Sequence, residues 1–326
     1  MTDPIASPET PPEPASPHRR WRVAVVIGLV VALTAGGLLL TRPQGPDVAL
    51  ALGFEEGATY RYRVTMSIDG TVDTPLAELP MVGELSETVA YEVVELAPDG
   101  AATIDVSVED VSGSFSGRPI PPATDVEMRM VIGPDGELRE VDGEPVPEAL
   151  GQGWADPSGS GGLPGMQSFP LLPDGPVGPG DEWVKDVEQP LPFGEGLVSV
   201  HSENEFVRYE DVGPIRTAVI ESAITSPIDW TIDLAELAEL GAQVDDGGGL
   251  TDLEGLPSTI SYRGEVAQDQ TTWLDPDRGE IVRSELAGEF DITTRARGGQ
   301  GFGALVGALP VRMIGEVHLT MERLAP

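Results

Sequence analysis

The stretch TYRYRVTMSID, residues Thr59–Asp69, decides the fold. Within it every second side chain is apolar or aromatic, and the side chains between them are polar or charged. Because successive side chains of a β-strand point to opposite faces, this period of two predicts a strand with one buried and one solvated face. The same alternation recurs further along the chain, through Ile104, Val106 and Val108 and through Val126, Met128, Met130 and Ile132. We therefore expect a protein built mainly of β-strands.

Short turns join the alternating stretches. Gly133-Pro134-Asp135-Gly136 lies between two of them, and Asp275-Pro276-Asp277-Arg278-Gly279 lies between two others. Such connections fit antiparallel hairpins, whereas parallel strands need crossovers of a dozen or more residues. The turns therefore predict antiparallel sheets.

Three blocks of the first half resemble three blocks of the second half in the same order. For example, EGATYRYRV resembles PGDEWVKDV. The three pairs begin at Glu56 and Pro179, at Val89 and Asn204, and at Arg129 and Thr271. We expect two pseudo-repeats, residues 50–180 and 175–326, whose antiparallel sheets form a half-barrel or a sandwich-like fold. The alternative is chance similarity between strand-turn-strand segments, since alternation itself produces weak matches.

Helical patterns are sparse. Asp233–Val244 has a narrow stripe of leucines, and a second short apolar run, Phe302–Leu309, lies between the last two strands. We therefore expect one or two short helices. A segment rich in glycine and proline, Asp142–Gly180, separates the repeats, and three of its apolar side chains are expected to pack against a sheet: Phe169, Leu171 and Leu172.

An uncharged run, Val23–Leu40, precedes the β-rich part of the chain. As a helix it would span about 27 Å, close to the thickness of a bilayer's hydrocarbon core. Three arginines precede the run and only Arg42 follows it closely, which favours a cytoplasmic N-terminus. We expect a disordered cytoplasmic tail (1–22), a transmembrane helix (23–41) and an extracellular β-rich domain (42–326) of a single-pass plasma-membrane protein. A cleaved signal peptide and a buried core helix are the alternatives.

Composition excludes several classes of function. The 326 residues carry a net charge of −36, so the phosphates of nucleic acid would be repelled. The chain has no cysteine, which excludes disulfides, thiolate metal sites, a thiol nucleophile and a lipid-modified cysteine. Its 40 glycines and 31 prolines favour turns over long helices.

The sequence predicts no catalytic, cofactor-binding or metal-binding residue. His201 and His318 lie in strand patterns without other histidines at ligand spacing, so we expect solvated or hydrogen-bonded side chains. No G-x-S-x-G motif and no phosphate-binding loop occurs. Weak calcium binding stays open at the acidic turns near Asp245 and Asp275, although neither has EF-hand spacing. A pair of glycosidase carboxylates also stays open, because such residues meet only in the fold.

Two motifs carry a resemblance to known proteins. They are V-x-x-G-D-E-W, with Val177, Gly180, Asp181 and Trp183, and the D-P-D-x-G-x-I hairpin, Asp275–Ile281. With the aromatic first strand, they resemble an uncharacterised family of secreted or membrane-anchored β-rich proteins of high-GC Gram-positive bacteria. More distantly, the chain is similar to lipoprotein-carrier half-barrels of the Lol type, whose curved sheet holds acyl chains. The second resemblance implies an apolar cavity, but this chain lacks the cysteine of such lipoproteins.

These observations favour a non-catalytic binding module on the outer face of the membrane. Its expected partners are the membrane itself, through residues 23–41, and an apolar ligand such as a lipid tail. The alternative is a structural or interaction protein of the cell envelope, whose acidic surface meets another envelope component. We expect no enzymatic activity.

Overall fold

The computed structural model describes residues 47–120, 127–141, 144–145, 169–190, 195–233, 258–298 and 310–325. The chain divides into two compact units, Met1–Gln44 and Gly45–Pro326, and all described residues belong to the second. Within these residues there is no helix of the length and apolarity needed to cross a bilayer. The predicted transmembrane segment, residues 23–41, lies outside them.

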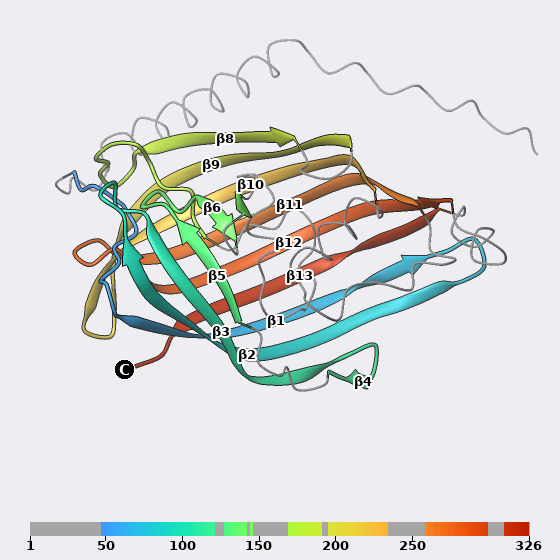
Figure 1. Cartoon of the computed structure of the whole chain (residues 1–326), viewed down its shortest axis with the longest axis horizontal. Helices are drawn as coiled ribbons and strands as arrows, with labels where there is room; N and C mark the ends of the chain where they lie inside the picture. Colours follow the sequence, from blue (N-terminus) through green and yellow to red (C-terminus); the bar gives the residue numbers. More distant parts are fainter. Residues whose placement is uncertain are drawn as a thin grey trace, which may run out of the picture. The chain divides into compact units, whose positions relative to one another are not determined.

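The described strands form one antiparallel sheet (Figure 1). Its strands are β1 (Thr59–Asp73), β2 (Glu78–Leu96), β3 (Ala102–Phe115), β4 (Arg118–Pro119), β5 (Glu127–Ile132), β6 (Leu138–Val141), β7 (Glu144–Pro145), β8 (Glu182–Pro190), β9 (Glu195–Val212), β10 (Ile215–Asp233), β11 (Thr259–Asp275), β12 (Glu280–Arg297) and β13 (Val311–Arg323). Their order across the sheet is β7-β6-β5-β3-β2-β1-β13-β12-β11-β10-β9-β8, and β4 pairs with β3.

The sheet consists of two meanders that meet in its middle. Strands β1 to β7 run outward to one edge, and β8 to β13 run inward from the other edge. The junction is the pairing of β1 with β13, in which Tyr62 lies opposite Arg323. The three pairs of similar sequence blocks fall on β1 and β8, on the hairpins β2–β3 and β9–β10, and on the hairpins β5–β6 and β11–β12.

The prediction of a mainly β, antiparallel protein is confirmed. The stretch Thr59–Asp69 forms most of β1, and the two predicted turns join β5 to β6 and β11 to β12. All the described strands belong to a single hydrogen-bonded sheet. No helix occurs among the residues described. Of the predicted helix at 233–244 only Asp233 is described, as the last residue of β10, and 302–309 lies outside the described residues.

The sheet has an inner face and an outer face. On β1 the side chains of Tyr60, Tyr62 and Ile68 are buried, whereas Arg61 and Arg63 between them are exposed. We call the face that carries Tyr60 and Tyr62 the inner face. The period of two therefore has a direct structural cause: one face of the sheet excludes water and the other is solvated.

A main cluster of buried apolar residues joins the two meanders. It contains Ile104 of β3 and Ile132 of β5 together with Phe206 of β9 and Ile220 of β10. These strands lie toward opposite edges of the sheet, so the sheet curls until its two halves share one core. In Figure 1 the short strands β5 and β6 accordingly lie in front of β10 to β12.

A second apolar cluster lies farther along the same strands. Its residues are Ile68, Met81, Ile228, Trp230, Val266, Leu286, Phe290, Ile292 and Val317. Within it Gly70 lies opposite Gly315 on the neighbouring strand. A Cβ added at Gly315 would stand 2.7 Å from Phe290 Cζ and 2.5 Å from the carbonyl oxygen of Asp69. Glycine is thus required where these backbones approach each other and an aromatic ring.

Candidate functional site

Two irregular segments, residues 47–58 and 169–181, close the end of the sheet that holds the main cluster. Leu52 N donates to Pro134 O at 2.6 Å and Leu172 N donates to Asp135 O at 3.1 Å, so both segments bond to the β5–β6 turn. Val48 and Val177 pair with each other. Leu172 is fully buried and Leu171 nearly so, which confirms the prediction that this part of the segment packs against the sheet.

The first segment also meets the β11–β12 turn. Gly53 N donates to Gly279 O at 2.9 Å, and a Cβ added at Gly279 would stand 2.1 Å from Gly53 N. The φ of Gly279 is +68°, a conformation that residues with a Cβ adopt at a cost. Glycine therefore allows the segment and the turn to touch, and this contact forms one wall of a hollow.

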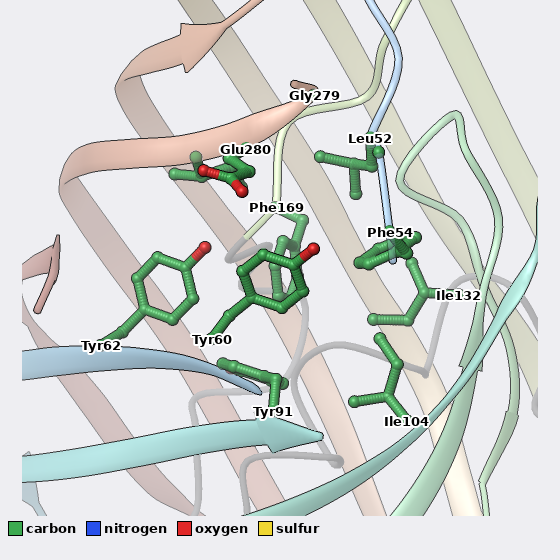
Figure 2. A pocket seen from close by; sticks show the side chains of 12 residues that line it. Leu52, Phe54, Tyr60, Tyr62, Tyr91, Ile104, Ile132, Phe169, Gly279 and Glu280 are labelled. Atoms are coloured by element: carbon green, nitrogen blue, oxygen red, sulfur yellow. The ribbon is translucent and has the colours of Figure 1, made fainter. Parts of the chain in front are cut away.

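The hollow lies between the two segments and the inner face (Figure 2). Its volume is about 30 Å³, roughly the space of a water molecule or a methyl group. Five aromatic and four aliphatic side chains line it, and Glu280 is its one charged lining residue. The lining residues are Leu52, Gly53, Phe54, Tyr60, Tyr62, Tyr91, Ile104, Ile132, Phe169, Gly279, Glu280 and Ile281.

The aromatic rings of the hollow meet edge to face. The ring centroids of Tyr62 and Tyr91 are 5.6 Å apart at 74°, and those of Tyr91 and Phe169 are 6.1 Å apart at 75°. Phe54 and Tyr60 make a similar contact at 6.5 Å. Edge-to-face pairs are favourable because the positive edge of one ring points at the negative face of the next. The rings thus form a wall held by edge-to-face contacts.

One ion pair borders this wall. Arg323, at the end of β13, pairs with Glu280, at the start of β12. The side chain of Glu280 is 9% exposed and that of Arg323 is 20% exposed. The guanidinium carbon of Arg323 also lies 5.5 Å from the centre of the Tyr60 ring. The Arg323 guanidinium is therefore held jointly by the Glu280 carboxylate and the face of the Tyr60 ring.

The two tyrosine hydroxyls of β1 differ in environment. Tyr60 Oη accepts a hydrogen bond from Glu55 N at 3.2 Å. Burial raises the pKa of the Tyr62 phenol far above its ordinary value, against a smaller opposing effect of Arg323. Tyr62 is therefore neutral at physiological pH and is not a base. The hollow combines apolar walls with one internally neutralised charge, an arrangement that can hold a small group.

A band of buried polar side chains lies beside the main cluster on the inner face. Gln270 Nε2 donates to Ser284 Oγ at 3.1 Å, and Ser202 Oγ donates to Asn204 Oδ1 at 2.9 Å. Among the described residues, the buried Ser222 Oγ and Trp230 Nε1 have no hydrogen-bond partner. On β11 the buried polar side chains of Gln268 and Gln270 thus lie between Leu274 of the main cluster and Val266 of the second cluster.

The two strand histidines are solvent-accessible, as the sequence predicts. His201 Nδ1 lies 2.6 Å from Asp186 Oδ1, and its Nε2 lies 3.5 Å from Glu203 Oε1. Its hydrogen bond to Asp186, followed by that to Glu203, raises the pKa of His201 above its usual value. His318 is exposed on β13. Neither histidine lines the hollow.

Asp275 and Glu280 of the acidic turn at 275–280 bond within the chain. Asp275 Oδ1 accepts hydrogen bonds from the backbone N of Asp277 at 3.0 Å and of Arg278 at 3.2 Å, which stabilises the turn itself. Glu280 is engaged by Arg323. Nowhere in the described ranges do three metal-ligating side chains come together. The acidic turn near Asp245 lies outside those ranges.

Sequence reasoning identified the aromatic residues of β1 but missed the ion pair. Arg323 follows Val317, Leu319 and Met321 in the alternation of β13, so it occupies the phase of the buried face. An arginine in that phase is the signal that could have indicated a buried partner. The partner itself, Glu280, gives no such signal because it begins its strand at a turn.

Comparisons with known proteins find only distant likenesses. No family model and no curated protein matches the chain, so the resemblance to a family of high-GC Gram-positive bacteria stays a prediction. A structure of lipovitellin, described as showing lipid–protein interactions, aligns with 83% of this chain at 11% identity and a TM-score of 0.34. This chain spans 25% of that lipovitellin chain. The hypothetical lipoprotein YmcC from Escherichia coli (K12) aligns over 77% of this chain and 82% of its own at 11% identity, with a TM-score of 0.22.

Proposed function

We propose that this protein is a non-catalytic binding module that shelters a compact apolar group in the hollow. The observation that carries the proposal is the lining: five aromatic rings and four aliphatic side chains surround the space, and its one carboxylate is paired with Arg323. Ligand sites are typically apolar with a few convergent polar groups. A volume of about 30 Å³ suits the end of a ligand, such as the tip of a lipid tail, rather than a whole lipid.

A photoreactive fatty acid tests this function in membranes that carry the full chain. A diazirine at the terminal carbon of the fatty acid should label peptides that line the hollow, such as those containing Tyr60 and Tyr91. The variant Ile132→Phe adds bulk to the lining and is expected to lower the labelling about tenfold, equivalent to about 1.4 kcal/mol of binding free energy. Val184→Phe, at a side chain that is 55% exposed, is the matched control and should label like the parent chain.

The outcome separates two functions. Equal labelling of the parent chain and of Ile132→Phe would contradict binding in the hollow, provided that circular dichroism shows both proteins to be folded. Reproducible protein partners without labelled lining peptides would favour the second candidate, an interaction protein of the cell envelope. That candidate has its own observation, a trough on the outer face. It is lined by the half-buried Glu205 and by four exposed acidic side chains, Glu182, Glu203, Glu221 and Asp269.

We further propose that residues 23–41 anchor the module in the plasma membrane, with the N-terminus in the cytoplasm. The proposal is supported by the uncharged run and the arginines before it. Since the chain has no cysteine, single cysteines report topology without background. In intact cells a membrane-impermeant maleimide should label Val184→Cys and not Ser16→Cys, which should react only after lysis. Labelling of Ser16→Cys in intact cells would reverse the orientation, and release of the module from the membrane would indicate cleavage.

A further inference from the structure

The turn between β1 and β2 exposes apolar side chains to solvent. Leu76 at the turn is 83% exposed, and Leu79 of β2 is 52% exposed. Thr74 holds the turn together, because its Oγ1 accepts hydrogen bonds from Leu76 N at 3.3 Å and from Ala77 N at 3.0 Å. Thr74 N also donates to Ala77 O at 2.9 Å. Leu76 therefore projects from a hydrogen-bonded turn, and we call residues 74–79 the apolar tip.

Two arginines project from the same end of the sheet. Asp73 of β1 lies opposite Arg312 of β13, which lies opposite Thr293 of β12. Strands β1 and β12 run in the same direction, so past this row β1 enters the apolar tip while β12 continues to Arg295 and Arg297. These two strands are two strand spacings apart, about 10 Å. In Figure 1 the β1–β2 turn and the end of β12 accordingly extend from the same end of the sheet.

These two arginines are not used by the fold. Both are exposed, and neither makes an ion pair with any residue that the structure describes. The nearest carboxylate before them in the chain, Asp291, is bound by Arg312 through hydrogen bonds of 2.8 and 2.6 Å. In a chain of net charge −36, this end of the sheet thus combines unpaired positive charge with exposed leucine.

We propose that this end of the sheet docks on an anionic lipid surface. The leucines of the apolar tip enter the acyl chains, and Arg295 and Arg297 contact the headgroup phosphates. Apolar side chains beside basic ones are typical of segments that bind at the membrane interface. A protruding tip can enter a fluid bilayer, whereas a protein partner would need a pocket shaped to receive it. The arginines add an attraction that salt screens, and Glu78 in the tip opposes it.

A fluorophore on the apolar tip tests this docking in the full chain. Since the chain has no cysteine, Ala77→Cys carries a single environment-sensitive label beside both leucines. The labelled chain is reconstituted into vesicles of phosphatidylcholine, alone or with about one third phosphatidylglycerol. In the anionic vesicles nitroxide-labelled lipid should quench the label, and a neutral aqueous quencher should reach it about threefold less well than in detergent. A label at Val184→Cys, a side chain that is 55% exposed on β8, should stay equally accessible throughout.

Variants separate the apolar and the charged parts of the contact. Leu76→Ser should remove most of the quenching by lipid in both kinds of vesicle. The double variant Arg295→Gln with Arg297→Gln should remove only the additional quenching that phosphatidylglycerol causes, and Glu78→Gln should increase it. Arg278→Gln is the matched control for general positive charge, because Arg278 is exposed on the turn at the other end of β11 and β12. It should behave like the parent chain.

Three results would overturn the inference. A tip label that is as accessible in anionic vesicles as in neutral detergent would exclude docking. Equal quenching of the parent chain and Leu76→Ser would show that the fluorophore itself enters the bilayer. Protection that persists in detergent and grows with protein concentration would show contact between copies of the chain instead. The inference goes beyond the proposed function, so these results leave the hollow to be tested separately by the fatty-acid labelling.

Discussion

Truncation of Phe206 to alanine is expected to lower the free energy of unfolding by about 3–5 kcal/mol. Phe206 is fully buried on β9, opposite the fully buried Ile220 of β10. Its ring centroid lies 5.0 Å from that of Tyr209 in an edge-to-face contact. The variant loses both the transfer free energy of the ring and the contacts around the cavity that it leaves. Because Phe206 belongs to the cluster shared by the two meanders, the loss should loosen the whole curled sheet.

Chemical unfolding of the full chain in neutral detergent measures this effect, with circular dichroism as the signal. Val184→Ala is the matched control, because that side chain is 55% exposed, and it should change the free energy of unfolding by less than about 0.5 kcal/mol. A Phe206→Ala variant as stable as the parent chain would mean that the two halves of the sheet do not depend on a common core.

Replacement of Arg323 by methionine should cost about 3 kcal/mol of stability. Methionine retains apolar bulk but leaves the carboxylate of Glu280, which is 9% exposed, without its partner. An unpaired charge in such a place has lost its hydration and gained no counter-ion. The double variant Glu280→Met with Arg323→Met should recover most of the loss, because it removes the stranded charge together with its partner.

An exposed ion pair provides the comparison. Arg263 and Asp229 pair at 3.1 Å, but their side chains are 78% and 75% exposed. Arg263→Met should therefore cost less than about 1 kcal/mol. If Arg323→Met proved as mild as Arg263→Met, the pair at the hollow would contribute no more to stability than an exposed surface pair.

Local patterns predicted the strands of this protein because burial on one face imposes a period of two on the side chains. The alternation in Thr59–Asp69 and the turn at 275–279 both correspond to the observed β1 and β11–β12 hairpin. The order of the strands could not be predicted in this way. Nothing local to β1 indicates that its second neighbour is β13, since that pairing depends on the summed packing of the whole sheet.

The hollow was hidden from the sequence for a related reason. Its lining comes from β1, β2, β3, β5 and β12 and from both irregular segments, so no single stretch carries its pattern. A bulge adds a second obstacle. Leu274 pairs with Ile281 while Trp273 pairs with Arg283, so Val282 is an extra residue and the alternation changes phase at the start of β12. If the alternation in the middle of β12 is extended back to its first residues, it assigns Glu280 and Ile281 to the wrong faces of the sheet.

The pairing of β1 with β13 has a consequence for biosynthesis. The hydroxyls of Thr65 and Thr320 hydrogen bond across this pair although they are 255 positions apart. During translation β1 cannot pair with β13 until β13 has been synthesised, on the order of tens of seconds later at ordinary elongation rates. For that time one edge of the first meander offers unpaired backbone groups to any neighbouring strand. The nascent chain should therefore depend on a chaperone, and its folding should be slow because the decisive contact is so distant in sequence.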